Sequence, residues 1–214
     1  MAQTGSDWRG RVGPLLTPNQ IDSILTMVKL PSGLYLQDSQ QAFGNAANDL
    51  NNQNPWLRAG NHTGFAVWLY EPKAWLGAKK EVVTRRFQTY REEDVPEDDR
   101  FQVLRVIVRP DTPEYLTAMG AANANNADHV VLRSINKAQV AQPVSLEPTT
   151  EEFWSALGAR ASFAGLFAIF SMADVERIRS GAPNREFFVT IIGAREKSNR
   201  DFRVKAKHFQ RLGD

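Results

Sequence analysis

Apolar residues gather along this chain in short runs that have the length of β-strands. Runs of four to eight apolar residues bounded by turn signals are typical of strands, and β-branched and aromatic residues favour that state. The strands are predicted at residues 34–36, 64–70, 81–90, 101–109, 129–135, 143–146, 163–170, 187–192 and 202–209. The acidic segment 91–100 between two of them is expected to be a solvated loop.

Helix start signals precede several other segments. Thr17 and Gln20 have the spacing of a capping box, and Pro18 occupies the first helical position. Thr149 and Glu152 have the same spacing, and so do Ser171 and Asp174. Helices are therefore predicted from residue 17, over 39–50, over 112–119, over 149–158 and from 171 to 181.

The last 50 residues or so have the most regular pattern. Segments 163–170 and 187–192 are uncharged and flank the helix capped by Ser171, which suggests a crossover between two parallel strands. Residues 202–209 then alternate, so that the basic side chains share one strand face with an aromatic ring. These side chains are Arg203, Lys205, Lys207 and Phe209.

Consecutive strands favour antiparallel pairing. We expect an α+β fold in which a largely antiparallel, mixed central sheet of about eight strands is flanked by short helices. Residues 1–15 are expected to form a loose N-terminal arm, with Trp8 as its anchor, and residues 16–214 a single domain. No composition break, low-complexity linker or internal repeat divides the longer segment.

Composition narrows the functional classes. The chain has 214 residues, 42% of them hydrophobic, and a formal net charge of +2, so any anion-binding surface must come from local clustering of bases. It contains no cysteine, which removes disulfides, thiol nucleophiles and Cys-ligated metal centres. No signal peptide and no membrane-length apolar segment is visible, so a cytoplasmic protein without a membrane partner is expected.

Motifs for catalysis are missing from the sequence. It has no P-loop, no dinucleotide-binding glycine motif and no nucleophile elbow, and its three histidines are isolated. We therefore expect no metal and no cofactor. A small metal-dependent or acid/base hydrolase remains an alternative, which requires Glu71, Asp111, Asp128 or Asp174 to converge in one cleft.

Basic strand faces are the remaining candidate site. If the strands that carry them were neighbours, cations and aromatic rings would share a surface suited to phosphates and bases. The candidate binding residues are Arg105, Arg109, Arg203, Lys205, Lys207 and Phe209. The preferred hypothesis is a non-catalytic binding or interaction domain for a protein or an anionic partner such as nucleic acid. A structural subunit of a capsid-like assembly is a further alternative, with an oligomer as its expected state.

Overall fold

The strands of this protein form two antiparallel sheets. The computed structural model describes residues 8–31, 33–37, 65–110, 127–154, 160–193 and 200–212. The five-stranded sheet has the order β1 (Leu34–Gln37), β2 (Phe65–Tyr70), β3 (Val103–Pro110), β7 (Arg160–Ser171) and β6 (Ser145–Trp154). The four-stranded sheet has the order β5 (Val140–Ala141), β4 (Ala127–Ser134), β8 (Phe187–Gly193) and β9 (Arg200–Val204). The α+β class and the antiparallel pairing are confirmed, and the strands divide between two sheets instead of forming one mixed sheet.

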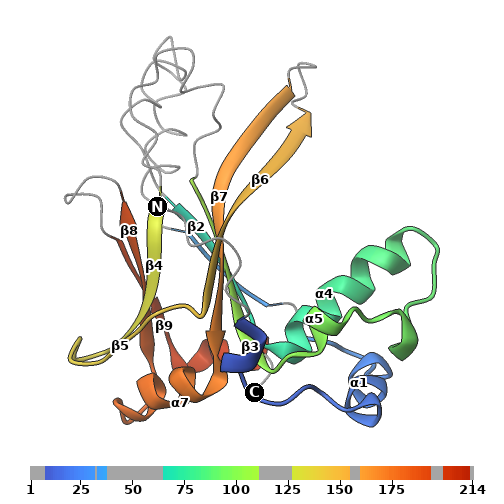
Figure 1. Ribbon diagram of the computed structural model, residues 1–214, viewed down its shortest axis with the longest axis horizontal. Helices are drawn as coiled ribbons and strands as arrows, with labels where there is room; N and C mark the ends of the chain where they lie inside the picture. The colour runs from blue at the N-terminus through green and yellow to red at the C-terminus, as the bar shows by residue number, and fades with distance from the viewer. Residues whose placement is uncertain are drawn as a thin grey trace.

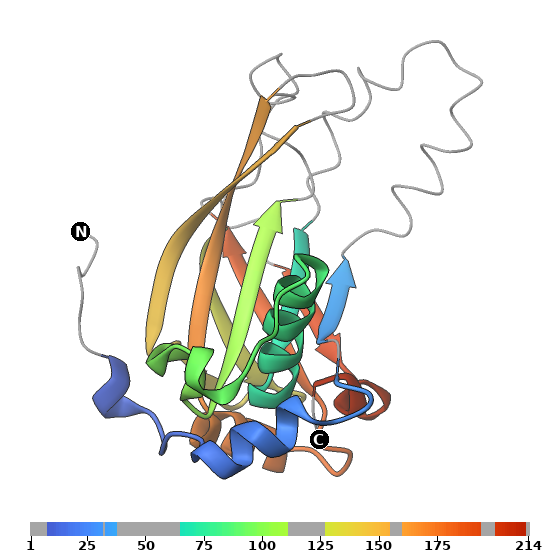
Figure 2. The ribbon, with the colours of Figure 1, turned by 90° about the vertical axis from the view of Figure 1, so that its right-hand side faces the viewer.

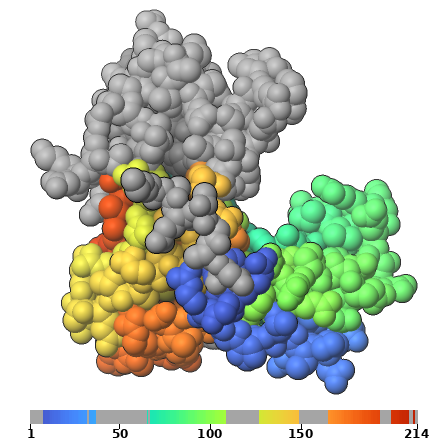
Figure 3. Space-filling model, viewed as in Figure 1, coloured from blue at the N-terminus to red at the C-terminus, as the bar shows by residue number. Residues whose placement is uncertain are grey.

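Helices build a third layer on the outer side of the five-stranded sheet. This layer contains α1 (Pro18–Leu25), α4 (Pro72–Arg85), the 3-10 helix η4 (Glu92–Asp94) and α5 (Glu97–Arg100). Figure 1 shows the four-stranded sheet, the five-stranded sheet and this helical layer side by side, and in Figure 2 α4 lies in front of the five-stranded sheet. In the space-filling view the helical layer projects as a lobe beside the sheets (Figure 3).

One hydrophobic core lies between the two sheets. Leu104 and Val106 of β3 point into it from one side, and Val189 and Ile191 of β8 from the other. Alternate residues of each strand therefore face the core and the outer surface. Each fully buried aliphatic side chain contributes about 1.5–3 kcal/mol through removal of apolar surface from water. Helix α7 (Met172–Ser180) closes one end of this core with Val175 and Ile178.

Two helix starts form as their sequences predict. The Gln20 amide donates to Thr17 Oγ1, and the Thr17 amide donates to Gln20 Oε1 at 2.8 Å, which completes a capping box at α1. At α7 the Asp174 amide donates to Ser171 Oγ at 3.2 Å, and the Ser171 hydroxyl donates to the Asp174 carboxylate at 2.8 Å. Helix capping therefore explains the spacing of Thr17 and Gln20 and that of Ser171 and Asp174.

The strand predicted over residues 81–90 is wrong, because α4 runs from Pro72 through this segment to Arg85. Proline begins the helix at its first position, and Ala74 and Gly77 pack on the buried face. The first turns of α4 are held by this burial, and the helix continues through residues of weak helix propensity such as Val82. Tertiary packing overrides local preference here.

The helix predicted over residues 149–158 is also wrong, because residues 145–154 form β6. The β6–β7 ladder is continuous over ten residue pairs, from Ser145↔Ile169 to Trp154↔Arg160. The β-branched residues Thr149 and Thr150 suit an extended strand, and Pro148 is tolerated because β6 lies at the edge of the sheet. The long apolar partner strand therefore decides the structure of this segment.

The parallel crossover predicted around α7 is not formed. Strand β7 belongs to the five-stranded sheet and β8 to the four-stranded sheet, so α7 joins two sheets. The strand expected over 202–209 ends at Val204 and is followed by a 3-10 helix, η6 (Ala206–His208), and by α8 (Phe209–Leu212). The helices predicted over 39–50 and 112–119 lie outside the described residues.

The N-terminal segment begins, in the described part, with the 3-10 helix η1 (Trp8–Arg11). Trp8 is buried and packs edge-on against Phe101, with 5.0 Å between the ring centroids. Trp8 thus holds this segment to the outer face of the five-stranded sheet. No helix among the described residues is long and apolar enough to cross a membrane.

Candidate functional site

The two strands with predicted basic faces lie in different sheets. Leu104 and Val106 of β3 face the shared core, so Arg105 between them points to the outer side of the five-stranded sheet. Phe202 and Val204 of β9 face the same core, so Arg203 points to the outer side of the four-stranded sheet. The core separates these two outer faces, and the predicted joint basic surface does not form. Arg109 also lies in β3, opposite Ala66 of β2.

Arg105 is an interior residue, with 2% of its surface exposed. Its Nη2 donates to the Asp98 carbonyl at 2.6 Å, and its guanidinium lies over the Trp75 ring at 5.1 Å from the centroid. Its Nη1 is buried without a hydrogen-bond partner among the described residues. Burial lowers the pKa of Arg105 to about 10, against the opposing effect of Asp99 and Asp98. Arg105 therefore supports α4 on the sheet instead of presenting a charge to a partner.

The other predicted cations are distributed around β9. Arg203 donates to Glu186 at 2.6 Å, and this hydrogen bond is the main cause of the lowered pKa of the Glu186 carboxyl. Lys205 and Lys207 are exposed but follow the end of β9, and Phe209 packs partly buried against the core. The predicted row of three cations and a phenyl ring on one strand face is therefore wrong.

The two carboxylates of this hypothesis that are held by other side chains, Glu71 and Asp174, have separate partners. Glu71 forms an ion pair with the buried Arg179. Asp174 interacts with Ser171 and, at 2.9 Å, with Arg177, while Asp128 is exposed on β4 and Asp111 lies outside the described residues. Within the described ranges, no group of three or more acidic or histidine side chains is arranged to hold a metal ion.

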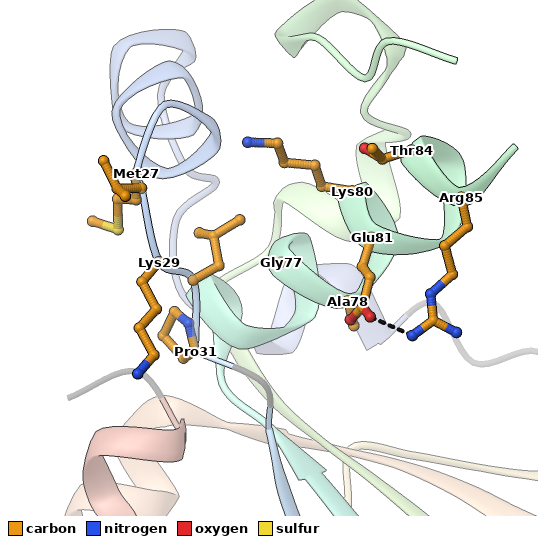
Figure 4. A pocket seen from close by; sticks show the side chains of 11 residues that line it. Met27, Lys29, Pro31, Gly77, Ala78, Lys80, Glu81, Thr84 and Arg85 are labelled. Carbon is orange, nitrogen blue, oxygen red and sulfur yellow. Dashed lines mark hydrogen bonds and ion pairs between the residues drawn. The ribbon is translucent and has the colours of Figure 1, made fainter. Parts of the chain in front are cut away.

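A groove of about 500 Å³ lies between α4 and the segment that follows α1. One wall consists of residues 27–31, and the other of the outer side of α4 from Gly77 to Arg85 (Figure 4). The walls meet at Gly77, where an added Cβ would lie 2.9 Å from Leu30 Cβ and 3.0 Å from the Pro31 carbonyl oxygen. Glycine is therefore required for residues 27–31 to cross the helix this closely.

Exposed apolar side chains occur both in residues 27–31 and along α4, although only those of residues 27–31 line the groove. Among the described residues, seven large hydrophobic side chains are exposed, and four of them lie in residues 27–31, on α4 or directly after α4. These four are Met27, Val28, Val82 and Phe87. Phe87 is fully exposed and has a positive φ of 59°, a conformation that is uncommon for an aromatic residue. These four side chains therefore keep much of their apolar surface in contact with water.

Positive charge accompanies this apolar surface. Residues 72–86 carry five basic residues and one acidic residue. Lys79 pairs with Asp99 at 3.5 Å and Arg85 with Glu81 at 2.5 Å. In the described part of the chain no carboxylate pairs with the remaining cations near the groove. We define the α4 surface as Met27, Val28, Val82 and Phe87 together with Lys29, Lys80 and Arg86.

Replacing Gly77 with alanine is expected to lower the free energy of unfolding by about 1 kcal/mol. Alanine favours helix over glycine by roughly 1 kcal/mol, but the overlap with Leu30 and Pro31 costs about 1–3 kcal/mol. Urea denaturation monitored by tryptophan fluorescence measures the difference. Thr84→Ala, at an exposed position of the same helix, is the control and should change stability by less than about 0.5 kcal/mol. A stabilised Gly77→Ala variant would contradict the close crossing.

Sequence reasoning missed the α4 surface because it assigned residues 81–90 to a strand. The available signals were Pro72, two residues after the end of β2, and the helix-forming residues Lys79 and Lys80 in the same segment. A helix that starts at Pro72 places Ala78, Glu81 and Arg85 along one side, where they line the groove.

Comparisons with known proteins add no functional assignment to this geometry. No protein-family model, no curated protein and no solved structure matches the chain.

Proposed function

We propose that this protein is a non-catalytic binding domain that docks a protein partner on the α4 surface. The observation that carries the proposal is that four of the seven exposed large hydrophobic side chains lie in residues 27–31, on α4 or directly after it, in segments that also carry cations without carboxylate partners in the described structure. The exposed side chains of Val28 and Phe87 contribute no hydrophobic stabilisation to the isolated fold, because their surface remains in contact with water. Contact with a partner would remove this surface from water.

The basic strand face expected from the sequence is a weaker candidate for the partner surface than the α4 surface. Arg203 of β9 is neutralised by Glu186, and Lys137, in the turn after β4, is neutralised by Asp201 of β9 at 2.5 Å. Ion pairs of this kind reduce the attraction for a polyanion such as nucleic acid. The partner surface is therefore moved from the strands to the helical layer, and a protein partner is preferred to a nucleic acid.

The role of the α4 surface in partner binding can be tested by substitution. The variant Val82→Glu/Phe87→Asn removes two exposed apolar groups, and asparagine accepts the positive φ at residue 87 readily. Val140→Glu, at an exposed position of β5, serves as a control on the other sheet. Quantitative affinity capture from extracts of the native cells should show partners that bind the wild type and the control and are lost with the α4 variant. Capture profiles that do not differ between the two variants would refute the proposal.

A further inference from the structure

We propose that the groove beside α4 binds an acidic, amphipathic helical segment of a partner protein. The proposal rests on the proposed function and specifies the chemistry of the partner. Apolar side chains of the segment would pack on the wall formed by residues 27–31, and its carboxylates would meet the lysines of the rim.

The groove walls provide the apolar contact. Met27 lines the groove and is 37% exposed, while Leu30 and Pro31 form the part of the wall that contacts α4 at Gly77. On the helix side Ala78 has a small side chain, so the backbone of a second helix can approach closely. A helix-in-groove complex uses this arrangement, in which apolar side chains at i and i+4 enter one channel.

The length of the groove matches a short helical segment. Its α4 wall extends over residues 77–85, which corresponds to roughly 12 Å at a rise of 1.5 Å per residue. About two turns of a partner helix cover this distance. An acyl chain would instead require an enclosed apolar channel, whereas Figure 4 shows a groove between a chain segment and the outer side of a helix.

The positive charges of Lys29 and Lys80, which we call the rim of the groove, favour acidic residues in the partner segment. Lys29 and Lys80 line the groove from opposite walls, and no carboxylate pairs with either of them among the described residues. Lys80 donates to the Leu25 carbonyl at 2.5 Å, which places its ammonium group at the C-terminal end of α1 and leaves further N–H donors. Glu81 is already paired with Arg85. The rim therefore carries two positive charges available to carboxylates.

The lining favours a peptide over a nucleic acid. Single-stranded nucleic acid is bound by aromatic rings that stack on the bases, together with a continuous track of cations. The lining residues include no aromatic side chain, and more than half of them are methionine, valine, leucine, proline, alanine or glycine. A segment with both apolar and acidic side chains matches this composition.

The test uses a fluorescein-labelled helical peptide of leucine, alanine and glutamate, with leucines at i, i+3 and i+4 spacing, in a polarisation titration with the full chain. Lys29→Glu is expected to weaken binding about five- to tenfold, since it replaces attraction by repulsion at the rim. Thr84→Trp, which fills the groove from an exposed position, should abolish saturable binding. Lys73→Glu makes the same charge change outside the groove and should alter the Kd by less than about twofold.

Three results would overturn the inference: no saturable binding of the acidic peptide, equal binding of a peptide with lysine in place of glutamate, or equal effects of Lys29→Glu and Lys73→Glu. Displacement of the acidic peptide by a single-stranded oligonucleotide that binds more tightly would also overturn it. If any of these results is found while partner capture still depends on Val82 and Phe87, the proposed function holds and the assignment of the groove fails.

Discussion

Replacing Arg179 with methionine is expected to lower the free energy of unfolding by about 3–5 kcal/mol. The Arg179 side chain has no exposed surface, and its guanidinium pairs with Glu71, whose side chain is 5% exposed. The guanidinium also lies over Phe209, 4.8 Å from the ring centroid. Removing one partner leaves the other charge buried in a low-dielectric environment, which is the costly outcome. Urea denaturation with linear extrapolation measures the loss.

A double-mutant cycle separates the ion pair from packing. In Glu71→Gln/Arg179→Met neither residue carries a charge, so the double variant should lose less stability than the sum of the single losses. Glu176→Gln is the control, because Glu176 pairs with the same arginine at 3.2 Å but is half exposed. Its effect should stay below about 1 kcal/mol. Additive losses in the cycle would show that Glu71 and Arg179 are not energetically coupled.

Arg105→Ala is the second substitution with a large expected effect, a loss of roughly 3 kcal/mol. It removes a buried side chain that bonds to the Asp98 carbonyl and lies over Trp75, and it leaves a cavity between α4 and β3. Arg105→Met should lose less, because methionine fills most of the volume and carries no N–H that requires a partner. Thermal and urea unfolding of both variants give the comparison.

Arg203→Ala provides the matched control for Arg105. Its side chain is about half exposed, and its partner Glu186 keeps the hydrogen bond from the Ala206 amide, so the expected loss is below about 1 kcal/mol. If Arg105→Ala kept wild-type stability and reduced partner capture, Arg105 would be a binding residue, as the sequence hypothesis had it. The structure predicts reduced stability instead.

Local signals predicted a large part of the fold. The capping residues Thr17 and Ser171 start helices at the expected positions, since the cap depends on a few neighbouring residues. The apolar runs of β2, β3, β7 and β8 form strands, because their side chains suit burial in a sheet. Segments with mixed signals failed, as in α4 and β6, where burial and pairing with distant residues outweigh local propensity.

The candidate site was less predictable than the fold. Alternation correctly indicated that Arg105 and Arg203 point away from the core of their sheets. It could not indicate that α4 covers Arg105, or that Glu186 neutralises Arg203. Both facts depend on residues distant along the chain or on which face a helix covers. The groove beside α4 forms only where residues 27–31 pack against this helix, and these two segments are distant along the chain.

By itself, the sequence determined that this is an α+β protein with antiparallel strands, no cysteine chemistry and two well-capped helices, because composition and short-range spacing are sufficient for these properties. The tertiary structure decided how the strands divide between two sheets, which arginines are buried and where apolar groups remain exposed. These depend on which elements pack together, and no short segment carries that information. For this reason the candidate interface moved from the basic strands to the groove beside α4.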